Sequence, residues 1–206
     1  NDIRAAYEPS WSRRGLWDRS YNESRTPEVP AMLLELLSHQ NFADMKYGLD
    51  PSFRFTVSRA IYKGILKYLS LANNVPYTVQ PLPVANFAAE LNGEGAVKLS
   101  WSPVSDPAEP TAEPTGYVVY TKLNDGGFDN GVVVKDTSAV LPINAGSIYS
   151  YKVVAINDGG ASFPSEILSV GVSPAAGAAK LALVVNGFER VSGPAVMPKD
   201  DSTFAG

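Results

Sequence analysis

The sequence contains no cysteine, which excludes disulfide bonds, thiolate metal sites and cysteine nucleophiles. It has no apolar run near 18 residues, so we predict no transmembrane helix. An excess of basic charge is also missing: the formal net charge is −4, which gives no support for nucleic-acid binding. The first residues, Asn1 to Arg4, lack the basic start and apolar stretch of a signal peptide. If the natural protein is exported, we expect this chain to be a processed or truncated piece of it.

Charge and arginine are unevenly distributed along the chain. Seven of the eight arginines lie in the first 60 residues. Residues 1–70 carry 10 basic and 8 acidic side chains, whereas residues 81–174 carry 4 basic and 10 acidic ones. The net charge therefore changes from +2 to −6 between these two segments. Such a change usually marks a boundary between modules, so we predict more than one domain.

One short segment near the N-terminus is almost entirely apolar. Residues 29–37, VPAMLLELL, are interrupted only by Glu35. A short run that is apolar on both faces is typical of a buried parallel strand. A carboxylate within such a strand is costly unless it has a partner or a catalytic task, so Glu35 is a candidate functional residue.

A helix is predicted farther along. Asp50 and Pro51 provide an N-cap and a proline in the first turn, and apolar residues then recur at helical spacing. This pattern predicts an amphipathic helix at about 51–70 that ends before Asn73–Asn74. A strand, a loop and a helix in this order predict part of an α/β domain for residues 1–75.

Beyond the helix the pattern changes. Three prolines in residues 76–83 predict an extended linker. Apolar residues then alternate with a period of two, and Asn-Gly and Asp-Gly pairs supply turns between the runs. Seven short strands in about 90 residues predict an antiparallel β-sandwich. The predicted strands include those near residues 97–101, 117–121, 132–134, 139–141, 149–156 and 167–172.

Residues 84–174 resemble a fibronectin type III domain. The resemblance rests on LSW at 99–101, GYVVY at 116–120 and YSYKVVAIN at 149–157, in this order. In that family a tryptophan on the second strand packs under the sheet, and a tyrosine near the start of the sixth strand closes a corner. Trp101 matches the first position, and Tyr149 or Tyr151 matches the second. The fold class is therefore α+β and multidomain, with a partial α/β unit and an all-β sandwich.

The N-terminal part resembles the end of a zinc-dependent N-acetylmuramoyl-L-alanine amidase. The matching segments are RG at 14–15, PAMLLELLS at 30–38 and AIYKGI at 60–65. In that family the glutamate of this strand works beside the zinc and assists attack of the metal-bound water on an amide. The resemblance assigns this catalytic role to Glu35.

The chain departs from that family in its metal ligands. The family binds zinc through two histidines and a glutamate upstream of this strand, whereas this chain has only His39, in the loop after it. One imidazole cannot make a catalytic zinc site, so the zinc would belong to the longer parent protein and not to this chain alone. The alternative for Glu35 is a structural ion pair with Arg14 or Arg59. His39 is expected to act as a hydrogen-bonding loop residue.

The C-terminal part predicts a second linker and the start of a truncated third domain over residues 175–206. Residues 183–194, LVVNGFERVSGP, resemble segments of exported bacterial proteins labelled xanthan lyase-like. In these, an amidase-like part, a fibronectin type III domain and a further α/β part follow one another. The resemblance therefore supports the predicted order of domains.

Three functions follow from these observations. The first is a fragment of an exported cell-envelope hydrolase that acts on peptidoglycan or another envelope glycan, with the sandwich as a spacer or binding platform. The second is a non-enzymatic scaffold or adhesion module of the cell surface. The third is part of a polysaccharide lyase, for which Tyr62 or His39 could serve as the base. The first two place the protein outside the cytoplasm, in the periplasm or on the cell surface.

Overall fold

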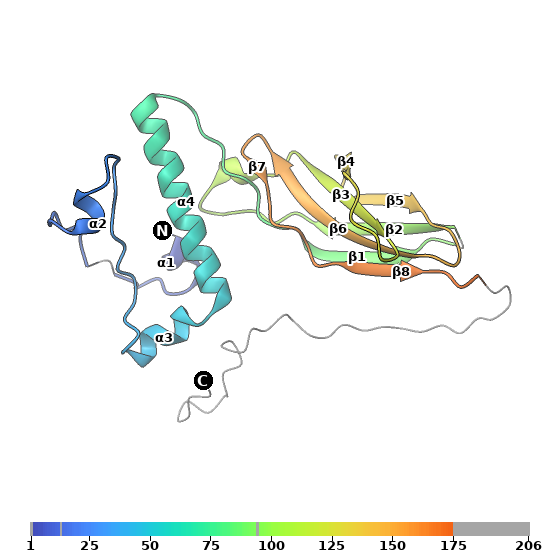
Figure 1. Cartoon of the computed structure of the whole chain (residues 1–206), viewed down its shortest axis with the longest axis horizontal. Helices are drawn as coiled ribbons and strands as arrows, with labels where there is room; N and C mark the ends of the chain where they lie inside the picture. Colours follow the sequence, from blue (N-terminus) through green and yellow to red (C-terminus); the bar gives the residue numbers. More distant parts are fainter. Residues whose placement is uncertain (1, 13, 94, 175–206) are drawn as a thin grey trace. The chain divides into compact units, whose positions relative to one another are not determined.

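The computed structural model describes residues 2–12, 14–93 and 95–174 (Figure 1). The predictions for residues 175–206 lie outside this described part. Contacts divide the chain into two compact units, and the division falls between Gly64 and Ile65, within the long helix α4 (Pro51–Asn73). The last turns of α4 therefore belong to the same unit as the residues that follow them.

The first unit has a small aromatic core. Phe53 is 1% exposed, and its ring lies 5.1 Å from that of Tyr7 between centroids. The rings of Tyr47 and Trp11 lie 5.4 and 5.7 Å from the Phe53 ring. This cluster joins the start of α4 to segments that are distant from it in sequence. The other helices of the unit are α1 (Asp2–Ala6), α2 (Asn22–Arg25) and α3 (Phe42–Gly48).

Helix α4 confirms the helix predicted at about 51–70. The Asp50 side chain accepts a hydrogen bond from the backbone N–H of Ser52, as expected of an N-cap. The helix ends at Asn73, and Asn74 takes a left-handed conformation with φ 51°, which asparagine tolerates at a helix end. None of the helices in the described part of the chain is long and apolar enough to cross a bilayer.

The prediction of a strand at residues 29–37 is wrong. These residues have no regular secondary structure, and Val29, Met32, Leu33 and Leu34 are 46–68% exposed. A parallel strand needs neighbouring strands to pair its backbone groups. The described residues of the first unit form no strand that could pair with it. The partial α/β architecture expected for the N-terminal part is therefore not present in the described chain.

The second unit contains the antiparallel sandwich predicted from the sequence (Figure 1). One sheet has the order β1-β2-β5, and the other has the order β4-β3-β6, with β7 and β8 both paired to β6. The strands are β1 (Ala85–Leu91), β2 (Ala96–Ser102), β3 (Gly116–Leu123), β4 (Val132–Val134), β5 (Ser138–Pro142), β6 (Ile148–Asn157), β7 (Gly160–Ala161) and β8 (Leu168–Gly171).

Alternate residues of the two sheets fill the core between them. Trp101 on β2 is 5% exposed and meets the ring of Tyr117 on β3 edge to face, at 5.3 Å. Such aromatic contacts add to the stabilisation from burial alone. The tryptophan of the second strand thus packs inside the sandwich, as the sequence predicts. The remaining core residues are Val84, Phe87, Val97, Leu99, Val119, Ile143, Tyr151, Val153 and Ala155.

Between β7 and β8 two serines continue the pairing with β6. The Ser162 hydroxyl accepts a hydrogen bond from the backbone N–H of Ala155. The Ser165 hydroxyl does the same for the N–H of Val153, and both bonds are 3.0 Å long and buried. Pro164, which lacks an N–H and cannot extend the ladder, lies between them. The two serine hydroxyls therefore provide hydrogen-bond acceptors for the backbone N–H groups of β6 where the pairing between regular strands is interrupted.

Candidate functional site

The predicted catalytic residue, Glu35, lies on the exposed segment that replaces the expected strand. Because it is exposed, Glu35 is not held in a buried ion pair with Arg14 or Arg59. His39 is also exposed and lies in the turn that follows. A catalytic role for Glu35 stays a prediction.

The described residues do not fit a zinc site on their own. They contain no group of three histidine, cysteine, aspartate or glutamate side chains that could hold a metal ion. The zinc that the amidase resemblance implies was assigned to ligands upstream of this chain, and it also stays a prediction.

The densest polar network of the second unit lies at one end of the sandwich, where the chain enters β1. We call this end the N-terminal pole; it comprises residues 77–83, 109–115 and 157–160. At its centre is Asn157, the last residue of β6. Its side-chain amide donates to the carbonyl oxygens of Val79, Thr111 and Glu113 at 2.9, 3.1 and 3.2 Å. One side chain therefore joins three backbone segments.

A second layer of the network fixes residues 77–83 to the sandwich. The backbone N–H of Val79 donates to the Thr111 hydroxyl at 3.1 Å, and that hydroxyl donates to the Glu109 carboxylate at 2.9 Å. Val79 and Pro81 are fully buried. Although three prolines and the lack of helical periodicity predict a linker here, these residues are packed against the sandwich.

Glu109 is a buried carboxylate, 2% exposed, and its charge is balanced by Lys67 from the last turns of α4. The Lys67 ammonium lies 3.4 Å from Glu109 Oε2 and 6.0 Å from the centre of the Tyr77 ring. Burial tends to lower the pKa of Lys67, but Glu109 and Tyr77 together raise it above its usual value. The ammonium therefore stays charged at neutral pH. Because half of the lysine side chain is exposed, solvent weakens this pair.

A close backbone approach completes the N-terminal pole. A Cβ atom added at Gly159 would lie 2.4 Å from the carbonyl oxygen of Thr78. Only glycine permits the turn after β6 to pack this tightly against the segment that precedes β1. The Gly159 N–H is satisfied by the side-chain oxygen of Asn157 at 2.8 Å.

These contacts hold structure together and do not form a reactive centre. The carboxylate and the ammonium are paired with each other, and the hydroxyl of Thr111 is engaged as both donor and acceptor. Sequence reasoning missed this network because its members are up to 78 positions apart. The only local signal is the Asn157–Gly160 sequence NDGG, which indicates a turn but not its partners.

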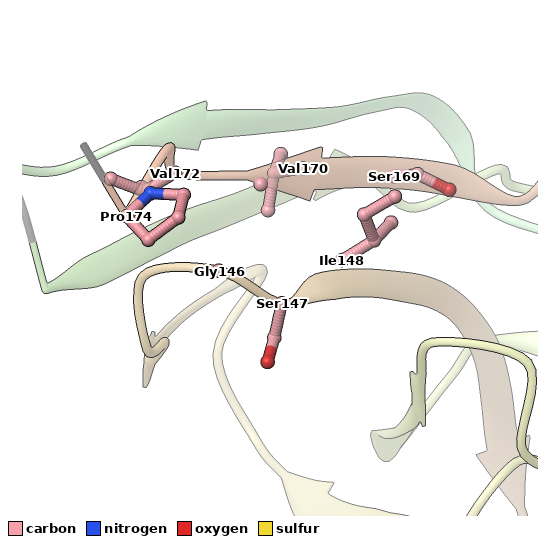
Figure 2. Close-up of a pocket in the computed structure, with 8 residues that line it drawn as sticks. Gly146, Ser147, Ile148, Ser169, Val170, Val172 and Pro174 are labelled. Carbon is pink, nitrogen blue, oxygen red and sulfur yellow. The ribbon is translucent and has the colours of Figure 1, made fainter. Parts of the chain in front are cut away.

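The opposite end of the sandwich, the C-terminal pole, comprises residues 92, 93, 95, 143–147 and 172–174. The backbone N–H of Ile143 donates to the carbonyl of Gly95 at 3.0 Å, and that of Gly146 donates to Val172 at 2.7 Å. Figure 2 shows the residues that line an open pocket here, where the turn before β6 and the start of β6 lie beside β8. Its lining is mostly apolar, with only the hydroxyls of Ser147 and Ser169 as polar side-chain groups.

Strand β6 connects the two poles. Its first residue, Ile148, pairs with Gly171 at the end of β8, and its last residue, Asn157, contacts the segment that leads into β1. Ten residues of strand span roughly 30 Å at about 3.3 Å per residue. The chain therefore joins the sandwich at one pole and leaves it at the other (Figure 1).

No protein-family model and no curated protein matches this chain. Similar solved structures include the twitchin kinase region from C. elegans, which is 23% identical over 46% of this chain and 17% of that one, with a TM-score of 0.41. The third fibronectin III domain of human KIAA0343 protein is 16% identical over 50% of this chain and 90% of that one, with a TM-score of 0.40. The FN3 domain of human collagen XX is 19% identical over 47% of this chain and 98% of that one, with a TM-score of 0.36. The second and third of these structures are fibronectin type III domains and the twitchin region includes one, whereas none bears on the amidase-like part.

Proposed function

We propose that the sandwich is a spacer module that holds the segments before and after it at a fixed separation. The observation that carries this proposal is the placement of the two chain connections at opposite poles, roughly 30 Å apart along β6. A domain whose two chain connections lay at the same end would not increase the distance between the segments that flank it. This arrangement extends a multidomain chain by nearly the whole length of the module.

The contacts at the N-terminal pole support a stiff connection on that side. A proline-rich segment that was free in solution would act as a semi-rigid linker at best. Here the backbone of Val79 is bonded on both its N–H and its carbonyl, and Lys67 pairs with Glu109. Residues 77–83 are therefore bonded to the sandwich, and Lys67 links the end of α4 to it through Glu109.

A distance measurement tests the spacer proposal. Because the chain lacks cysteine, Leu71→Cys and Ala145→Cys introduce two unique labelling sites, one on exposed α4 and one at the C-terminal pole. Paired spin labels at these sites should give one narrow distance distribution. Asn157→Ala should broaden it, whereas Asp158→Ala, which removes an exposed neighbouring side chain, should not. A broad distribution in the unmodified background would contradict the proposal.

At the level of the longer protein, we propose an exported cell-envelope hydrolase of the amidase type, with zinc as cofactor and peptidoglycan as substrate. This assignment rests on the sequence resemblance around Glu35 alone. Intact mass and zinc content of the natural protein test it directly. Bound zinc, together with loss of peptidoglycan hydrolysis in Glu35→Gln, would support it. Absence of both metal and activity in the full-length natural protein would leave only the non-enzymatic spacer.

A further inference from the structure

The turns of the sandwich differ in how their glycine N–H groups are satisfied. Within the described part of the chain, four glycines directly follow an asparagine or aspartate: Gly93, Gly126, Gly131 and Gly159. The N–H groups of three of them donate short hydrogen bonds, to Leu123 O, Asp129 Oδ1 and Asn157 Oδ1 at 2.8–3.0 Å. The Gly93 N–H donates no hydrogen bond to another described residue.

This difference matters because an Asn-Gly pair can react with itself. The glycine nitrogen loses its proton and attacks Cγ of the preceding asparagine, so that a C–N bond forms and the Cγ–Nδ2 bond breaks, releasing ammonia. Water then opens the five-membered imide at either carbonyl, which gives aspartate or isoaspartate. Water is consumed, ammonia is released and no electrons are transferred. The reaction needs a free glycine nitrogen and a backbone that can rotate, and glycine favours rotation because it has no Cβ.

The pair Asn130–Gly131 meets neither requirement. The Gly131 N–H donates to the Asp129 carboxylate at 3.0 Å, so the nitrogen is not free to attack. The backbone is also held by its surroundings, because a Cβ added at Gly131 would lie 2.4 Å from Val118 Cγ1 and 3.0 Å from the Tyr120 ring. Gly131 is therefore fixed against strand β3 in its left-handed conformation, with φ 77°.

The pair Asn92–Gly93 meets both requirements. Both residues are exposed, and no atom lies within 4 Å of a Cβ added at Gly93. The Asn92 backbone N–H donates to the Ala96 carbonyl at 2.8 Å, and the Gly95 carbonyl accepts from the N–H of Ile143 at 3.0 Å. Neither bond uses the two reacting groups, and among the described residues the Asn92 side-chain amide and the Gly93 nitrogen have no hydrogen-bond partner.

We propose that Asn92 is a site of spontaneous deamidation, while Asn130, which has the same following residue, is protected by the fold. The product places a new carboxylate at the C-terminal pole, three positions before Gly95, whose carbonyl accepts the hydrogen bond from Ile143. In the isoaspartate form it also adds one carbon to the main chain between β1 and β2. The surface at this pole therefore changes in charge and shape with the age of the protein.

Peptide mapping by mass spectrometry tests this proposal on the whole chain. The whole chain is incubated in warm, mildly alkaline buffer, and conversion of the asparagine –NH2 to –OH is followed by the mass of each peptide. The peptide with Asn92 should be converted at least about fivefold faster than the peptide with Asn130. About fivefold is the rate ratio that corresponds to the free energy of one hydrogen bond. In denaturant the two rates should converge, because both pairs have the same intrinsic chemistry. Equal rates in the folded protein, or a faster reaction at Asn130, would overturn the proposal.

A variant checks the cause of protection. Asp129→Ala removes the acceptor of the Gly131 N–H and should raise the rate at Asn130 towards that at Asn92. Asp136→Ala removes an exposed carboxylate near β4 and should leave both rates unchanged. Circular dichroism identifies a variant that has lost its fold, and in that case the ratio between the folded and denatured wild-type chain decides alone.

Discussion

Tyr149 and Tyr151 stack their rings 6.5 Å apart on strand β6, yet their hydroxyl groups lie in opposite environments. The Tyr149 hydroxyl accepts a hydrogen bond from the backbone N–H of Asn144 at 3.2 Å. The Tyr151 hydroxyl is buried and has no hydrogen-bond partner among the described residues. The sequence left open which of the two closes the corner of the sandwich, and this geometry identifies Tyr149.

Removing the two hydroxyls should have different effects on stability. Tyr149→Phe should lower the free energy of unfolding by about 0.5–1.5 kcal/mol, because a hydrogen bond is lost. Tyr151→Phe should leave it unchanged or raise it, because a buried polar group without a partner is removed. Chemical denaturation of both variants measures this difference. A clear loss of stability in Tyr151→Phe would show that its hydroxyl has a partner.

The same residue predicts how stability depends on pH. Burial, with a smaller contribution from Tyr149, raises the pKa of Tyr151 from 10.0 to about 12. The unfolded chain therefore loses this proton first, so the free energy of unfolding does not depend on this group well below pH 10.0 and falls as the pH rises from 10.0 to about 12. The pKa values of Tyr7, Lys67 and Tyr117 are also raised above their usual values, so the wild-type slope has further sources besides Tyr151. Stability curves of Tyr151→Phe and wild type should diverge in this window, and parallel curves would contradict the assignment.

The serine that bridges the interrupted last strand should be important for stability. Ser165→Ala leaves the buried N–H of Val153 without its side-chain acceptor and should cost about 1–3 kcal/mol. Ser138→Ala, at an exposed position on β5, is a suitable control and should stay within about 0.5 kcal/mol of wild type. Thermal or chemical unfolding gives both values. Equal stability of the two variants would mean that water replaces the hydroxyl.

The close approach at the N-terminal pole gives a steric prediction. Gly159→Ala places a methyl group 2.4 Å from the Thr78 carbonyl, and because both are on the main chain neither can rotate away. We expect a loss of about 1–3 kcal/mol. Gly127→Ala, where a Cβ would meet no atom within 4 Å, should be nearly neutral. A neutral Gly159→Ala would show that residues 77–83 can move away from the sandwich at little cost.

Local patterns in the sequence predicted the regular elements well. The cap at Asp50 and the helical spacing after it located α4, and alternation with glycine turns located most strands of the sandwich. Strand β1 was not located because its sequence, ANFAAEL, is rich in alanine and its register shifts between Ala85 and Ala88. When most residues of a strand are small, the hydrophobicity of its two faces differs little, and the alternation that marks a strand is weak.

Features that depend on distant partners could not be predicted in this way. The run at residues 29–37 is apolar enough for a buried strand, but a strand exists only where another strand pairs with it. The hydrogen bonds of the Asn157 side chain could not be predicted from local sequence either, because its acceptors are 44–78 positions away. The role of Glu35 stays a prediction for the same reason, because the ligands it would work beside are not part of this chain.

The interruption around Pro164 also affects how copies of the sandwich meet one another. An exposed sheet edge recruits further strands when it offers a long, unbroken row of free backbone groups. In this sheet β4 has three residues and β8 has four, and the serine-bridged segment separates β8 from β7. As far as the described strands extend, neither edge is long enough to serve as a template for aggregation. The edges of this sheet therefore offer neighbouring copies of the sandwich little backbone to pair with.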